Sequence, residues 1–239
     1  MSAETGMTDG SGHAERMDAM YRYQRHIYDL TRKYYLLGRD RMITELDLPQ
    51  DGTLLEVGCG TGRNLLAARR HYPTARLHGL DISAEMLASA RHTFRRESDQ
   101  PVLRVADASR FAPEDFGIAG FDRVMISYAL SMIPDWQAAI DRALAALSPS
   151  GSLHIVDFGQ QERLPSFAHA GLQAWLARFH VTPRGDLRDV LEGQAMRTGT
   201  RLTFEPLWRG YAWHAVLGRG GMRPCEKITA SDGLHVTPF

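Results

Sequence analysis

The chain has 239 residues, 44% of them hydrophobic, which is enough to bury one sizeable core. The 28 basic and 28 acidic residues cancel, which argues against a general nucleic-acid binder, because such proteins are strongly basic. The two cysteines give no disulfide framework, and the sequence shows neither a signal peptide nor an apolar run of bilayer length. We therefore expect a cytoplasmic protein.

Composition divides the chain into four segments. Residues 1–15 are small and polar and are typical of a disordered leader. Residues 16–52 are expected to form an amino-terminal helical cap, and residues 53–217 the main α/β domain. Residues 218–239 form a tail without clear periodicity.

Strands and helices alternate from residue 53 onward. The predicted strands cover residues 53–57, 75–80, 102–105, 121–127, 153–158, 201–204 and 211–217. The predicted helices cover residues 63–71, 85–95, 135–147 and 167–179, with Ser83 as an N-cap and turns at 149–151 and 205–207. This rhythm predicts a doubly wound, mostly parallel sheet with helices on both faces.

The most informative stretch is Leu-Leu-Glu-Val-Gly-Cys-Gly-Thr-Gly at residues 54–62. Glycine lets the backbone turn tightly and approach a ligand closely, and the free N–H groups of the following helix then face that ligand. A dinucleotide loop has the spacing G-x-G-x-x-G, whereas here Arg63 stands where the last glycine would fall.

The spacing G-x-G-x-G resembles the first motif of class I S-adenosylmethionine-dependent methyltransferases. The resemblance implies a Rossmann-like, seven-stranded sheet ending in an antiparallel hairpin. It also implies S-adenosylmethionine as cofactor and S-adenosylhomocysteine as product. NAD is the alternative cofactor, because Asp81 fits either ligand and only the third glycine is missing.

Four predicted strand ends carry candidate cofactor ligands, since doubly wound sheets bind ligands at the carboxyl ends of their strands. Asp81 follows Gly62 by 19 residues, where a carboxylate can accept hydrogen bonds from both ribose hydroxyls. The resemblance implies that Asp107 accepts from the adenine amine and that Ser127 faces the methionine part. Each feature alone is weak, because a strand-end Asp is more often a helix cap. The expected cofactor-binding residues are Glu56, Gly58, Gly60, Thr61, Gly62, Asn64, Asp81, Ile82, Met86, Asp107, Ala108 and Ser127.

Residues 20–40 hold five tyrosines and five Lys or Arg residues. Tyr21, Arg25, Tyr28, Arg32 and Tyr35 follow steps of four and three, which places them on one helical face. Guanidinium groups bind carboxylates in bidentate fashion, and aromatic faces attract methylated ammonium groups. The alternative is a surface helix whose arginine stems and tyrosine rings only pack on the domain surface, without a binding role.

The segment Arg-His-Ile-Tyr-Asp-Leu-Thr-Arg-Lys-Tyr-Tyr-Leu-Leu-Gly-Arg-Asp at residues 25–40, followed by the glycine loop, resembles the bacterial diacylglycerylhomoserine N-methyltransferases of betaine-lipid synthesis. The resemblance extends from about residue 21 to residue 217. It implies three successive methylations of the amino group of a homoserine head group on diacylglycerol, giving diacylglyceryl-N,N,N-trimethylhomoserine.

This reading assigns roles to seven residues. Tyrosine hydroxyls can orient the amine lone pair, and arginines can bind the carboxylate of the acceptor or that of the cofactor. The candidate catalytic residues are Tyr28, Tyr34, Tyr35 and Tyr128, and the candidate substrate-binding residues are Tyr21, Arg25 and Arg32. We expect no metal site.

Two other functions are compatible with the sequence. One is a methyltransferase of a soluble amine, phenol or quinone precursor, and the other is a non-catalytic S-adenosylmethionine-binding partner subunit. A lipid acceptor also predicts peripheral contact with the anionic inner face of the membrane. The reason is that residues 16–41 carry seven Lys or Arg against three Asp.

Overall fold

The computed structural model describes residues 37–161 and 182–219. The expected leader, most of the aromatic and basic helix, the predicted helix over residues 167–179 and most of the tail lie outside the described residues. Predictions on those segments stay predictions.

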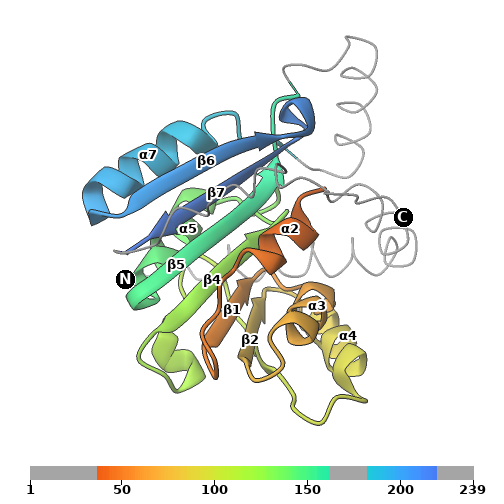
Figure 1. Ribbon diagram of the computed structural model, residues 1–239. Helices are drawn as coiled ribbons and strands as arrows, with labels where there is room; N and C mark the ends of the chain where they lie inside the picture. Colours follow the sequence, from red (N-terminus) through yellow and green to blue (C-terminus); the bar gives the residue numbers. More distant parts are fainter. Residues whose placement is uncertain (1–36, 162–181, 220–239) are drawn as a thin grey trace, which may run out of the picture.

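One seven-stranded sheet forms the centre of the molecule (Figure 1). Its order is β3-β2-β1-β4-β5-β7-β6, with β1 to β5 parallel and β7 antiparallel to both neighbours. This confirms the expected doubly wound, mostly parallel sheet. The strands are β1 (Thr53–Val57), β2 (Arg76–Asp81), β3 (Val102–Val105), β4 (Phe121–Ser127), β5 (Leu147–Phe158), β6 (Arg201–Leu207) and β7 (Ala212–Gly218).

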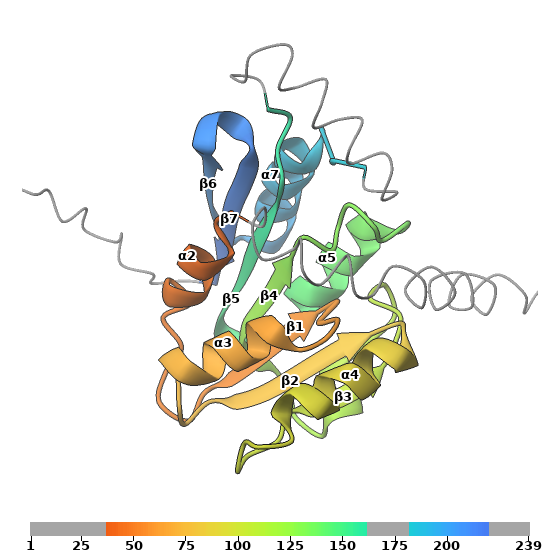
Figure 2. The same ribbon diagram turned by 90° about the vertical axis from the view of Figure 1, so that its right-hand side faces the viewer.

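Helices cover both faces of the sheet, and Figure 2 shows α2 and α3 on one side with α5 and α7 on the other. Alternate residues of each strand enter the two cores: Leu54 packs with the α2–α3–α4 side, and Leu55 with the α5–α7 side. The helices are α2 (Arg39–Thr44), α3 (Arg63–His71), α4 (Ala84–Phe94), α5 (Trp136–Ala145) and α7 (Leu187–Thr198), with two 3₁₀ turns, η1 (Pro113–Phe116) and η2 (Trp208–Gly210).

Two predicted turns are wrong, because both segments lie within strands. Strand β5 already begins at Leu147, and the Pro-Ser-Gly sequence at 149–151 forms a bulge within it, because Phe121 pairs with Leu147 and Arg123 with Ser152. The sequence Glu-Pro-Leu at 205–207 belongs to β6, and the hairpin turn follows at Trp208–Gly210. The sheet tolerates Pro206 because β6 is an edge strand.

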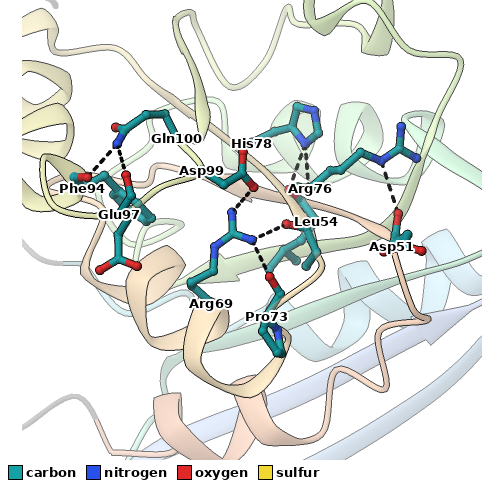
Figure 3. Close-up of polar contacts among 11 residues, drawn as sticks. Asp51, Leu54, Arg69, Pro73, Arg76, His78, Phe94, Glu97, Asp99 and Gln100 are labelled. Atoms are coloured by element: carbon teal, nitrogen blue, oxygen red, sulfur yellow. Dashed lines mark hydrogen bonds and ion pairs between the residues drawn. The ribbon is translucent and has the colours of Figure 1, made fainter.

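The amino ends of β1 and β2 are held by polar contacts, shown in Figure 3. The Arg69 guanidinium donates to the carbonyls of Pro73 and Ala75, at 2.9 and 2.8 Å, and pairs with Asp99 at 2.7 Å. These bonds fasten α3 to the start of β2. The amino-terminal edge of the sheet is therefore stabilised by hydrogen bonds and an ion pair within the protein.

Helix α2 is the described part of the expected cap, and Gly38 begins it with a left-handed φ of 87°. A Cβ at Gly38 would lie 2.6 Å from Leu207 Cδ1, so glycine allows the chain to turn close to β6. At the helix's other end the Tyr72 hydroxyl donates to the Thr44 carbonyl. Arg41 adds a bidentate pair with Glu205 at 2.7 and 3.1 Å.

Candidate functional site

The register of the parallel strands brings the predicted site residues to one edge. Val57 pairs with Leu80 and with Ile126, so the loops after β1, β2 and β4 begin side by side. The loops after β3 and β5 follow at the same level, since Asp81 pairs with Val105 and Ser127 with Val156. This is the carboxyl edge, where doubly wound sheets bind ligands.

The glycine loop after β1 is shaped by left-handed backbone angles: Gly58, Gly60 and Gly62 have φ values of 72°, 51° and 73°. Its start is fixed because the N–H groups of Gly58 and Cys59 both donate to the Leu80 carbonyl at 2.9 Å. A Cβ on Gly58 would lie 2.8 Å from the Cβ of Ala129. Glycine is therefore needed both for the turn and for the close approach of two loops.

Asp81 holds this loop in place. One carboxylate oxygen accepts the N–H of Gly60 at 2.8 Å, and the other accepts the N–H of Ser83 at 2.9 Å. The carboxyl is 9% exposed and lies at the end of β2 as expected. Each carboxylate oxygen has more than one acceptor direction, so shaping the loop is compatible with binding a ribose hydroxyl.

Glu56 and Asn64 form a second anchor, because the Asn64 amide donates to Glu56 Oε1 at 2.6 Å. Glu56 is 1% exposed and lies near the end of β1, so this bond fastens the first turn of α3 to the strand before the glycine loop. The Thr61 carbonyl accepts from Thr93 Oγ1 of α4 at 2.9 Å. The loop is thus supported from two helices.

The loops after β2 and β3 complete this half of the edge. Ser83 caps α4 as predicted, its hydroxyl accepting the Met86 N–H at 3.2 Å, and the Met86 side chain is buried. Asp107 accepts from the N–H and the hydroxyl of Ser109, both at 2.8 Å. Ile82 and Ala108 lie beside them, half-buried and buried.

The two residues at the end of β4 behave differently. Ser127 is 2% exposed, and its hydroxyl has no hydrogen-bond partner within the described part of the chain. Tyr128 has a φ of 53°, and its hydroxyl donates to the carbonyl of Leu37. Burial is the main cause that raises the pKa of Tyr128 far above its usual value, so this hydroxyl does not serve as a phenolate base. The hydroxyl instead donates its proton in the hydrogen bond that positions the chain before α2.

One buried carboxylate at the end of β5 is not among the residues predicted from the sequence. Asp157 lies near the end of β5, 2% exposed, and accepts the N–H of Phe158 at 2.8 Å and that of Ser131 at 3.4 Å. Burial raises its pKa to about 6. Arg184 donates to the carbonyls of Leu130 and Ile133, at 3.1 and 2.8 Å. A strand-end carboxylate, the signal that identified Asp81, also marks Asp157.

Of the predicted catalytic and acceptor residues, only Tyr128 lies within the described residues. The others are Tyr21, Arg25, Tyr28, Arg32, Tyr34 and Tyr35, which all lie before residue 37. Their roles stay predictions.

The residues present fit the expected cofactor. Three left-handed glycines turn the loop after β1, and the carboxylates of Asp81 and Asp107 stand at neighbouring strand ends. The Ser127 hydroxyl has no hydrogen-bond partner among the described residues. Cys59 within the loop is buried, and burial, followed by the charges of Asp81 and Glu56, raises the pKa of its thiol. It therefore stays a neutral packing residue, not a nucleophile.

Comparison with known sequences agrees with this geometry. Residues 55–153 match the family described as a methyltransferase domain. Trans-aconitate 2-methyltransferase of Variovorax paradoxus is 32% identical over 114 residues, covering 48% of this chain and 41% of the relative. Phosphatidylethanolamine N-methyltransferase of Cereibacter sphaeroides is 33% identical over 134 residues, covering 55% and 61%. A 2-phytyl-1,4-naphtoquinone methyltransferase of Thermosynechococcus vestitus is 35% identical over 138 residues, covering 55% and 58%. The matches thus span about half the length of these relatives.

Solved structures show the same fold at low identity. The plantazolicin methyltransferase BpumL, solved with a triazolic desmethylPZN analog and SAH, has a TM-score of 0.64 and 13% identity over 87% of this chain and 97% of its own. A SAM-dependent methyltransferase from Aquifex aeolicus has a TM-score of 0.57 and 15% identity over 88% and 98%. Fold and loop geometry agree with the family match over residues 55–153. The carboxyl edge of the sheet fits S-adenosylmethionine, and we call it the cofactor edge.

Proposed function

We propose that this chain methylates the amino group of a homoserine head group on diacylglycerol, in three successive rounds, to give the trimethylated betaine lipid. The observation that carries the proposal is the sequence at residues 25–40, which joins the glycine loop in one chain. A relative named as a phosphatidylethanolamine N-methyltransferase supports the choice of an amine-headed lipid, since its name gives an acceptor of that chemical class.

S-adenosylmethionine supplies an electrophilic methyl group on a sulfonium. In this proposal the described residues bind and orient the reactants: the glycine loop and Asp81 shape one half of the edge, and Ser127 ends β4 in the other half. Tyr128 positions the chain at Leu37. Methyl transfer needs the acceptor in line with the bond that breaks, so positioning supplies much of the rate. The amine must lose a proton to water before each round. In the first two rounds the neutral amine keeps an N–H, and a residue that accepts a hydrogen bond from it holds the lone pair in line. In the third round the amine carries no N–H, and contacts around its methyl groups must position it.

The basic and aromatic segment provides the acceptor contacts in this proposal. Arg25 and Arg32 bind the homoserine carboxylate, and the tyrosines line the amine and tolerate the permanent charge of the methylated product. Tyr128 fixes the chain at Leu37, which lies within that segment and two residues after Tyr35. The segment's place in the sequence therefore ties the acceptor site to the cofactor edge.

A soluble methyl acceptor is the second candidate, because relatives named as trans-aconitate and naphtoquinone methyltransferases match the same half of the chain. Methyl-labelled S-adenosylmethionine, offered with synthetic diacylglycerylhomoserine, phosphatidylethanolamine, trans-aconitate or a demethylated naphthoquinone, separates the candidates. Label in the homoserine lipid as mono-, di- and trimethyl product supports the proposal. Label entering only another acceptor overturns it, and binding of the cofactor without transfer identifies a non-catalytic subunit.

A further inference from the structure

The tip of the β6–β7 hairpin carries an exposed aromatic and a cation. Trp208 is 50% exposed, one of the few large apolar side chains left in solvent within the described residues. Arg209 is exposed and takes part in no ion pair among those residues. Leu37 is a neighbour of this tip: it is 36% exposed and precedes Gly38, where an added Cβ would lie 3.2 Å from the Trp208 ring. We call the three residues Leu37, Trp208 and Arg209 the rim.

The rim lies at the cofactor edge of the sheet. Leu207, which precedes Trp208, pairs with Ala212, and Ala212 pairs with Phe158 at the carboxyl end of β5. The hairpin tip and the loops that follow β4 and β5 therefore point the same way (Figure 1).

The backbone conformation of this turn does not favour the residue types that occupy it. Trp208 and Arg209 have φ values of 44° and 60°, and Gly210 has 81°. A hairpin turn with consecutive left-handed residues favours Asn and Gly, which adopt this conformation at little cost, whereas Trp and Arg do not. Strained side chains that persist in a turn point to a role outside it.

We propose that the rim is a contact with an anionic lipid surface, which presents the cofactor edge to the bilayer. The inference rests on the proposed lipid acceptor, since only an acceptor embedded in a bilayer requires the edge to face one. Tryptophan sits at the level of the head groups, with its ring in the apolar zone and its N–H in water, and a neighbouring unpaired arginine binds lipid phosphate. A surface of mixed aromatic and cationic character fits this occupant.

Flotation of the full chain with vesicles of phosphatidylglycerol and phosphatidylcholine tests the contact. We expect Trp208→Ala and Arg209→Glu each to lower the bound fraction severalfold. Met196→Ala and Arg201→Glu are the matched controls: Met196 is an 80% exposed apolar side chain on α7, and Arg201 is an exposed arginine at the other end of β6. Both controls should float as wild type does.

Arg209→Gly separates binding from folding, because it removes the charge and relieves the left-handed strain together. The variant should melt no lower than wild type and yet bind vesicles less. Brominated lipid chains should quench part of the tryptophan emission of wild type, and Trp208→Phe should abolish that part.

Failure of wild type to float, or rim variants that float as well as the controls, overturns the contact. A Trp208-dependent doubling of mass without vesicles would instead assign the tip to contacts between copies of the chain. Flotation needs no methyl acceptor, so it stands apart from the labelling assay. Labelling of the homoserine lipid in detergent micelles without vesicle binding would overturn the rim alone.

Discussion

The hydroxyl of Tyr128 donates a hydrogen bond to the backbone carbonyl of Leu37, 91 residues earlier in the chain. Tyr128 follows β4 at the cofactor edge, and Leu37 precedes the glycine at which α2 begins. The ring also packs edge-on against Phe158, with centroids 4.7 Å apart. One side chain therefore connects the loops after two strands with the point where the amino-terminal segment joins the domain.

Tyr128→Phe removes this hydrogen bond and keeps the ring. We expect a loss of about 1 kcal/mol in the free energy of unfolding, and about tenfold lower turnover from poorer positioning of the acceptor segment. The affinity for S-adenosylhomocysteine, measured by calorimetry, should change little. Tyr72→Phe is the matched control, since its hydroxyl donates to Thr44 at the other end of α2. Equal turnover in both variants would remove Tyr128 from acceptor positioning.

Gly58→Ala tests the close approach of the glycine loop to the loop after β4. The new Cβ would lie 2.8 Å from Ala129 Cβ at a φ of 72°. Gly117→Ala provides the control, because Gly117 has a φ of 74° and open space around it. Strain alone should cost each variant roughly 1–2 kcal/mol. Urea unfolding should show the larger loss for Gly58→Ala, and only this variant should bind S-adenosylhomocysteine more weakly.

Asp81→Asn should weaken cofactor binding, because the N–H groups of Gly60 and Ser83 lose a charged acceptor and the glycine loop loosens. Loss of about 1.5–3 kcal/mol of such bonding corresponds to a tenfold or greater rise in the dissociation constant. Asp122→Asn is the control at the opposite edge, where Asp122 accepts from the N–H and hydroxyl of Thr53. An Asp81→Asn protein with wild-type affinity for S-adenosylhomocysteine would show that this carboxylate does not support the site.

The sequence was sufficient to predict which loops meet at the carboxyl edge of the sheet, because the signals for these loops are local. Glycines at alternate positions, a strand-end Asp81 and the N-cap Ser83 act within a few residues of their partners, and the predicted helix over residues 63–71 has the observed bounds. Parallel strands then bring such loops to one edge whatever their distance in sequence.

Other features depend on contacts between distant residues and leave little local pattern. The Tyr128–Leu37 bond links positions 91 residues apart, and Pro206 is read as a turn residue until the strand is known to lie at an edge. Helix α7 escapes prediction because only Leu187, Leu191 and Gln194 are buried in it, which is too few to mark an apolar face.

The raised pKa of Asp157 predicts that the free energy of unfolding falls as the pH rises. Its pKa is raised from 3.8 to about 6 in the folded protein, mainly by burial, so the folded state holds its proton more tightly. The favourable contribution is complete below pH 3.8 and is lost as the pH rises to about 6. The full effect is on the order of 3 kcal/mol.

Asp157→Asn should abolish this loss, because the amide stays neutral while its oxygen can still accept a backbone N–H. The variant's free energy of unfolding in urea should exceed that of wild type at pH 8 and approach it at pH 4. A constant difference between the two proteins across this range would show that Asp157 does not titrate with folding.

The lowered pKa of His154 predicts the opposite dependence, a free energy of unfolding that falls as the pH falls. It is 1% exposed on β5, its Nε2 lies 2.9 Å from Ser152 Oγ, and burial together with the neighbouring His214 lowers its pKa from 6.5 to about 3. The folded protein therefore excludes the imidazolium, so its contribution is complete above pH 6.5 and is lost as the pH falls toward 3. Each pH unit below 6 should remove about 1.4 kcal/mol.

His154→Gln removes the titration and His92→Gln, on the exposed end of α4, serves as its control. Urea unfolding between pH 7.5 and 4.5 measures the slope of stability against pH for all three proteins. We expect His92→Gln to follow the wild-type slope and His154→Gln to be flatter, since a glutamine amide gains no proton in this range. Parallel slopes in the wild type and His154→Gln would mean that water or a rearranged partner reaches the imidazole and that this side of the sheet opens before the chain unfolds.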